Sequence, residues 1–81
     1  MEKIKTNKGA VLYKTKKYIH FVMELKSGKF LAQLSDNTNK ATDPHKLHAK
    51  IHILEHTDTV EDALKLVGWD VELFGIPKEL S

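Results

Sequence analysis

Four of the five histidines lie between Asp43 and His56, in the stretch of the chain best suited to chemistry. If this stretch forms a helix, His45, His48, His52 and His56 recur at spacings of three and four residues and form one stripe. Two histidines one helical turn apart can share a zinc ion. A helix would therefore predict a histidine-based metal-binding protein.

A strand fits the same stretch better. From Leu47 to Ile53, apolar and polar residues alternate at every position, as they do in a half-buried strand. In a strand His48 and His52 would lie about 13 Å apart, at ~3.3 Å per residue. We therefore expect a strand over residues 47–54 and assign no metal and no cofactor, and metal binding stays an alternative that needs the helix.

No set of residues predicts catalysis. The serines do not stand in a spacing that suggests a nucleophile with its base, and the chain has no cysteine. The acids from Glu55 to Asp62 surround the predicted start of a helix, where capping accounts for them. The four glycines are scattered, so they form no phosphate-binding loop. We expect a protein that is not an enzyme.

Charge is divided unevenly along the chain, although the formal net charge is only +2. Residues 1–50 hold eleven lysines against four acids, a net charge of +7, whereas residues 51–81 hold two lysines against seven acids, a net charge of −5. This division predicts a basic partner-binding region. It also fits an acidic part packed on a basic part, or two copies packed head to tail. The candidate binding residues are Lys14, Lys16, Lys17, Tyr18, His20, Lys46, His48, Lys50 and His52.

Three strands are predicted near residues 10–14, 18–26 and 29–35, from β-forming residues and period-2 alternation. We favour a turn over residues 14–17 rather than one long bent strand, because strands usually span five or six residues. A Ser27-Gly28 loop is expected to close the second hairpin. The pairs that this loop predicts are Leu25 with Phe30, Met23 with Ala32, and Phe21 with Leu34.

Alternation also assigns the two faces of this sheet. We place Ile19, Phe21, Met23 and Leu25 toward the core and the neighbouring polar positions outward. Three apolar residues on the outward face are candidate contacts for a protein partner: Val22, Leu31 and Leu54.

One helix is predicted over residues 59–67, with Asp58 or Thr59 as its N-cap. Gly68 fits the position after the helix, and Trp69 would then pack back on the last turn as in a Schellman motif. Alternation predicts a last strand over residues 70–74, which would allow a βαβ crossover.

Together these elements predict one α+β domain over residues 1–81, with a four- or five-stranded mixed or antiparallel sheet and one helix on one face. We expect frayed ends at 1–9 and 76–81 and a mobile loop at 35–44. The chain is 41% hydrophobic and 30% charged, as globular proteins are, and it has no apolar run long enough to cross a bilayer. These features favour a cytoplasmic protein that does not act at a membrane.

The predicted function is a small binding module that regulates or inhibits a larger protein through an exposed sheet face or edge. The alternative is a nucleic-acid-binding protein that uses its lysine-rich N-terminal half, since phosphate contacts need only lysine. A homodimer is compatible with either function.

Overall fold

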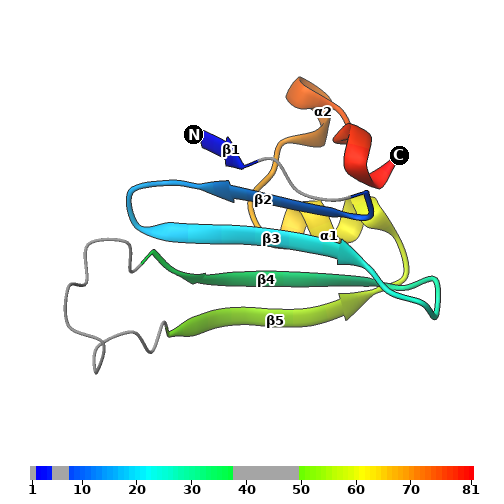
Figure 1. Cartoon of the computed structure of the whole chain (residues 1–81), viewed down its shortest axis with the longest axis horizontal. Helices are drawn as coiled ribbons and strands as arrows, with labels where there is room; N and C mark the ends of the chain where they lie inside the picture. The colour runs from blue at the N-terminus through cyan, green and yellow to red at the C-terminus, as the bar shows by residue number, and fades with distance from the viewer. Residues whose placement is uncertain (1, 5–7, 38–49) are drawn as a thin grey trace.

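The computed structural model describes residues 2–4, 8–37 and 50–81 of the chain. It confirms the α+β class and, of the two predicted sheet types, the antiparallel one, because every strand pairing in these residues is antiparallel. The mixed sheet and the βαβ crossover are wrong. Each strand pairs with its neighbour in the sequence, in the order β1-β2-β3-β4-β5 (Figure 1). The strands are β1 (Glu2–Ile4), β2 (Ala10–Lys14), β3 (Tyr18–Glu24), β4 (Phe30–Asp36) and β5 (Ile51–Thr57). The helical segments are α1 (Val60–Leu66), α2 (Val71–Phe74) and the 3-10 turn η2 (Lys78–Leu80).

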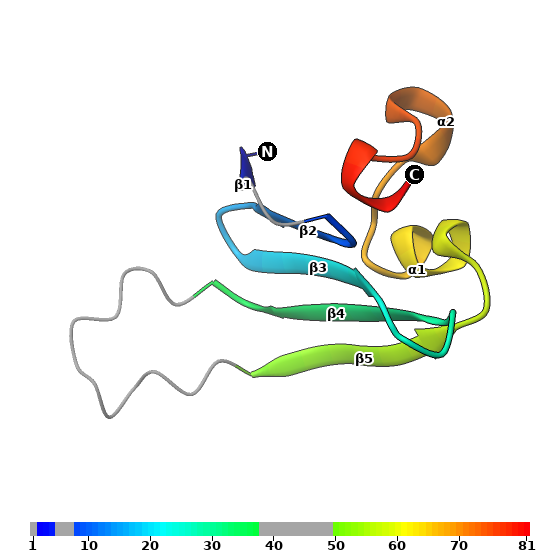
Figure 2. The ribbon, with the colours of Figure 1, turned by 45° about the vertical axis from the view of Figure 1, so that its right-hand side comes forward.

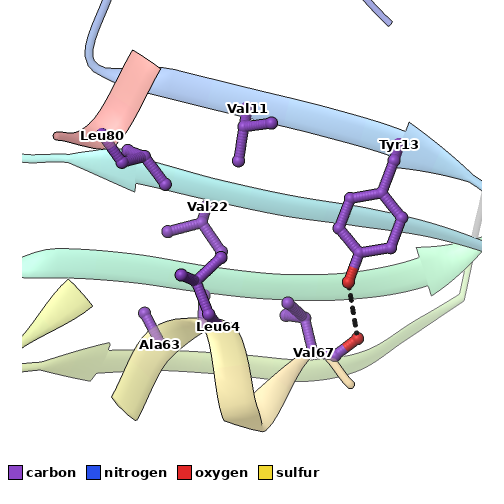
Figure 3. Close-up of a cluster of buried hydrophobic side chains, with 8 residues drawn as sticks. Val11, Tyr13, Val22, Ala63, Leu64, Val67 and Leu80 are labelled. Atoms are coloured by element: carbon purple, nitrogen blue, oxygen red, sulfur yellow. Dashed lines mark hydrogen bonds between the residues drawn. The ribbon is translucent and has the colours of Figure 1, made fainter. Parts of the chain in front are cut away.

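The three helical segments lie on one side of the sheet (Figure 2). The core forms between this side of the sheet and α1, and its sheet residues are small apart from Tyr13 (Figure 3). The buried residues of this cluster are Val11, Tyr13, Val22, Ala32, Ala63, Leu64, Val67 and Leu80. No helix in the described part of the chain has the length and apolar character needed to span a membrane.

The turn between β2 and β3 is confirmed, so residues 10–25 are not one bent strand. The Thr15 amide donates to the Tyr18 carbonyl at 2.9 Å. The Tyr18 amide donates in return to the Thr15 hydroxyl oxygen at 3.1 Å. A threonine side chain thus closes the turn by replacing a backbone acceptor.

The predicted register of the β3–β4 hairpin is wrong by one residue. Its loop has three residues, 26–28, because Gly28 takes the left-handed conformation (φ 89°) at the third position rather than the second. The Leu25 amide donates to the Lys29 carbonyl at 2.8 Å, which aligns Met23 with Leu31 and Val22 with Ala32.

The assignment of the two sheet faces is also wrong. Val22 is fully buried beneath α1, whereas Phe21 and Met23 are only half-buried and lie outside the core cluster. Val22 and Ala32 belong to the same buried cluster as the α1 residues Ala63 and Leu64, and Phe30 and Leu34 on the same face of the sheet pack against that cluster. Period-2 alternation separates two faces but does not say which one a helix covers.

Both predicted ends of α1 are confirmed, and the structure selects between the two candidate caps. Thr59 is the N-cap, with its hydroxyl oxygen accepting from the Asp62 amide at 3.2 Å. At the other end the Trp69 amide donates to the Leu64 carbonyl at 2.9 Å, and Gly68 has φ 85°. This is the Schellman ending that Gly68 predicts.

The strand predicted over residues 70–74 is wrong, because Val71 to Phe74 form the single helical turn α2. The Asp70 carboxylate accepts from the Leu73 amide at 3.1 Å and so caps a turn in place of a strand ladder. Gly75 then ends the turn with φ 71°. Alternation over only five residues is therefore a weaker predictor of structure here than the Asp70 cap.

Strand β5 confirms the strand prediction for residues 51–54 and excludes the helix there. The tail predicted to be frayed instead contributes Leu80, 7% exposed, to the core, and its Glu79 carbonyl accepts from the Gly9 amide at 2.7 Å. In the predicted loop, Ser35 and Asp36 end β4, and positions 38–44 lie outside the described residues, as do 47–49 of the predicted strand.

Candidate functional site

The sheet face opposite α1 carries most of the large apolar side chains that the core does not use. The strand registers arrange it as three rows of four residues across β2, β3, β4 and β5. We call these twelve residues the open face; Ser35 is the one among them that is buried, with 7% of its surface exposed. The rows are Lys14, Ile19, Ser35 and Ile51; Leu12, Phe21, Gln33 and Leu54; and Ala10, Met23, Leu31 and His56.

The open face is apolar and almost without charge. Among these twelve residues Lys14 carries the only fixed charge, and the β1–β2 register continues its row to Glu2. At the β5 edge Ile51 is 49% exposed and Leu54 is 55% exposed. Phe21 and Met23 in the middle are half-buried, since the neighbouring rows pack around them. Apolar surfaces of this kind are frequent at sites of interaction, which makes the open face a candidate site.

Two of the three predicted apolar contacts lie on this face. Leu31 and Leu54 belong to the open face, whereas Val22 is in the core. Sequence reasoning missed Phe21 and Met23 as surface residues because it assigned them to the core. Size gives no signal for the choice, because Phe30 and Leu34 lie on the core side of β4 together with Ala32.

Several of the predicted basic residues gather at one end of the sheet. Lys16 and Lys17 are exposed in the β2–β3 turn. The Asn37 amide donates to the Lys17 carbonyl at 2.9 Å, and the Asp36 amide donates to the Lys50 carbonyl at 3.0 Å. These bonds bring the turn, the end of β4 and the start of β5 together. Lys46 and His48 lie outside the described residues.

His20, also predicted as a binding residue, is buried, with 9% of its surface exposed. Its ring stacks on Tyr13 at 4.4 Å between centroids and 12° between planes. Its Nδ1 lies 2.6 Å from the Val67 carbonyl oxygen, which can only accept, so Nδ1 carries the proton and donates. His20 therefore joins the sheet to α1 and offers no open ring face to a partner.

Tyr13 reaches the same carbonyl. Its hydroxyl donates to the Val67 oxygen at 3.1 Å, while its ring is 1% exposed (Figure 3). Burial raises the pKa of Tyr13 to about 12, because the phenolate would lose its hydration there. The phenol thus stays a donor at neutral pH.

Tyr18 and His52 lie beside this aromatic group at the surface. The His52 Nε2 is 2.6 Å from the Asp36 Oδ1, and the Tyr18 ring meets the His52 ring edge-on at 5.3 Å. The irregularity in the β4–β5 register lies at His52 and turns it toward Asp36, whereas His56 lies on the open face. No group of three potential metal ligands occurs within residues 2–4, 8–37 and 50–81.

The structure therefore offers two candidate surfaces, the open face and the lysine-rich end of the sheet. The open face is built from the four strands β2, β3, β4 and β5. Comparison of the chain with protein-family models, with curated proteins and with solved structures finds no match.

Proposed function

We propose that this chain is a non-enzymatic protein-binding module that regulates or inhibits a larger protein by docking through its open face. The observation that supports this most is the set of three rows, in which eight of twelve residues are apolar and only Lys14 is charged. A surface with so little charge suits an apolar protein surface and not a phosphate backbone. As part of this proposal, the protein acts in the cytoplasm.

The middle row is expected to dominate the binding energy. Phe21 lies between Leu12 and Gln33 in the register, and Leu54 ends the row at the β5 edge. Aromatic side chains near the centre of an interface contribute most because surrounding contacts exclude water from them. The partner should therefore present an apolar surface that covers β3 and β4.

Two matched leucines allow a direct test. Leu54→Glu places a charge on the open face, whereas Leu73→Glu changes a leucine that is 71% exposed on α2, away from that face. In pull-downs from cell extract, Leu54→Glu should reduce capture of the specific partner at least ~10-fold, because an unpaired charge would be buried. Leu73→Glu should capture as much as the wild type. Equal capture by all three proteins would refute docking through the open face.

Nucleic-acid binding is the second candidate, favoured by the gathering of Lys14, Lys16, Lys17 and Lys50 at one end of the sheet. If it holds, a Lys16→Glu/Lys17→Glu double variant should lose binding to random DNA or RNA, and wild-type binding should weaken steeply with salt. Lys26→Glu/Lys29→Glu, in the hairpin at the other end of the sheet, is the matched control. No shift of any nucleic acid by the wild type at low salt would exclude this candidate.

A further inference from the structure

We infer that, when no partner is bound, a second copy of this chain covers the open face, so that two sheets pack face to face in a homodimer. This inference rests on the proposed function, because it assigns an occupant to the same surface. Self-association would then regulate docking, since the larger protein could bind only after the two copies separate.

The layers of the fold give the first reason. A sheet with one apolar face is complete once a helix covers it. Here the buried residues Val22 and Ala32 face α1, yet Phe21 and Leu31, the next residues along the same strands, are apolar as well. The sheet is therefore suited to being the middle layer of a larger stack. Among the residues that the structure describes, none forms a second layer on this face.

The charge layout of the open face gives the second reason. Lys14 stands at the β2 end of its row, where the β1–β2 register pairs it with Glu2, and β2 is far across the sheet from β5. A two-fold axis parallel to the strands places β2 of one copy over β5 of the other, so the two Lys14 side chains do not meet. An axis across the strands also separates them, because it places Lys14 over the Ala10 end of the second β2. In either arrangement the apolar rows of the two copies face each other, and the two positively charged Lys14 side chains do not.

The size of the open face gives the third reason. Four strands ~4.8 Å apart and three rows along them span roughly 20 by 20 Å. Two such faces have a flat area of about 800 Å² in total, and protruding side chains raise the buried area toward ~1,200 Å², the lower limit for a specific, stable interface. Homodimer interfaces are also more apolar than the remaining protein surface.

The mass in solution tests the inference. By light scattering after gel filtration or by sedimentation, the full wild-type chain should be a dimer at micromolar concentration. Leu54→Glu should raise the dimer dissociation constant roughly 100-fold or more, because each dimer buries two such charges. Leu73→Glu should leave the constant unchanged, and circular dichroism should verify that both variants are folded.

The outcomes separate this inference from the proposed function. A wild type that stays monomeric up to hundreds of micromolar, or a Leu54→Glu variant that remains as dimeric as the wild type, overturns the dimer. If capture of a partner depends on Leu54 in a monomeric wild type, the dimer fails and the proposed function stands. If the dimer depends on Leu54 and no partner does, self-association stands and the proposed function fails.

Discussion

At the scale of single residues, the Val67 carbonyl connects helix and sheet. It accepts from the Tyr13 hydroxyl at 3.1 Å and from the His20 Nδ1 at 2.6 Å, at the end of α1. Carbonyls at a helix end lack partners within the helix, so bonds from the sheet satisfy one that would otherwise be orphaned. Tyr13 and His20 face each other across β2 and β3, and their stacked rings hold the two donors in place.

Tyr13 should make the fold sensitive to alkaline pH. Its pKa is about 12 in the fold against a usual value of 10.0. The fold therefore favours the neutral phenol, and this contribution to stability is complete below pH 10 and is lost as the pH rises from about 10 to 12, by up to ~2.7 kcal/mol. Urea unfolding across this range should show the loss in the wild type and not in Tyr13→Phe. A parallel loss in both proteins would assign it to other groups.

At the scale of elements, local signals were the predictable part of this fold. The β2–β3 turn and the ends of α1 depend on a few adjacent residues, such as Thr59 and Gly68, and the sequence predicts them correctly. The register of the β3–β4 hairpin depends on loop geometry, and the choice of core face depends on where α1 packs. The alternation of apolar and polar residues predicts neither of these. The candidate site is predictable in part: the sequence predicts an exposed sheet face, but its alternation assigns Phe21 and Met23 to the core.

Helix α2 should depend on its cap because it has only one turn. Asp70→Ala removes the acceptor for the Leu73 amide and should cost about 1 kcal/mol of unfolding free energy. Asp70→Asn keeps a side-chain oxygen and should cost little. Both are measurable by urea unfolding followed by the fluorescence of Trp69, whose indole donates to the Gly75 carbonyl at 2.7 Å. Similar losses for the two variants would mean that the cap does not hold the turn.

At the scale of the whole molecule, β3 and β4 are flanked on both sides by other strands, whereas β5 is an edge. Amide hydrogen exchange should therefore be slowest in β3 and β4, since they open only with global unfolding. The amides of β5 that point away from β4 should exchange fast even at high protein concentration. If they become protected as concentration rises, two β5 edges are pairing, and the open face is not the interface.

The apolar rows of the open face also have a calorimetric consequence. Covering them removes hydrocarbon from water, which lowers the heat capacity of the system, whether the cover is a regulated protein or a second copy. The apolar contribution to that association weakens on cooling. Cooling should therefore weaken this association and raise the fraction of the protein in which Leu12, Phe21 and Leu54 are exposed to solvent.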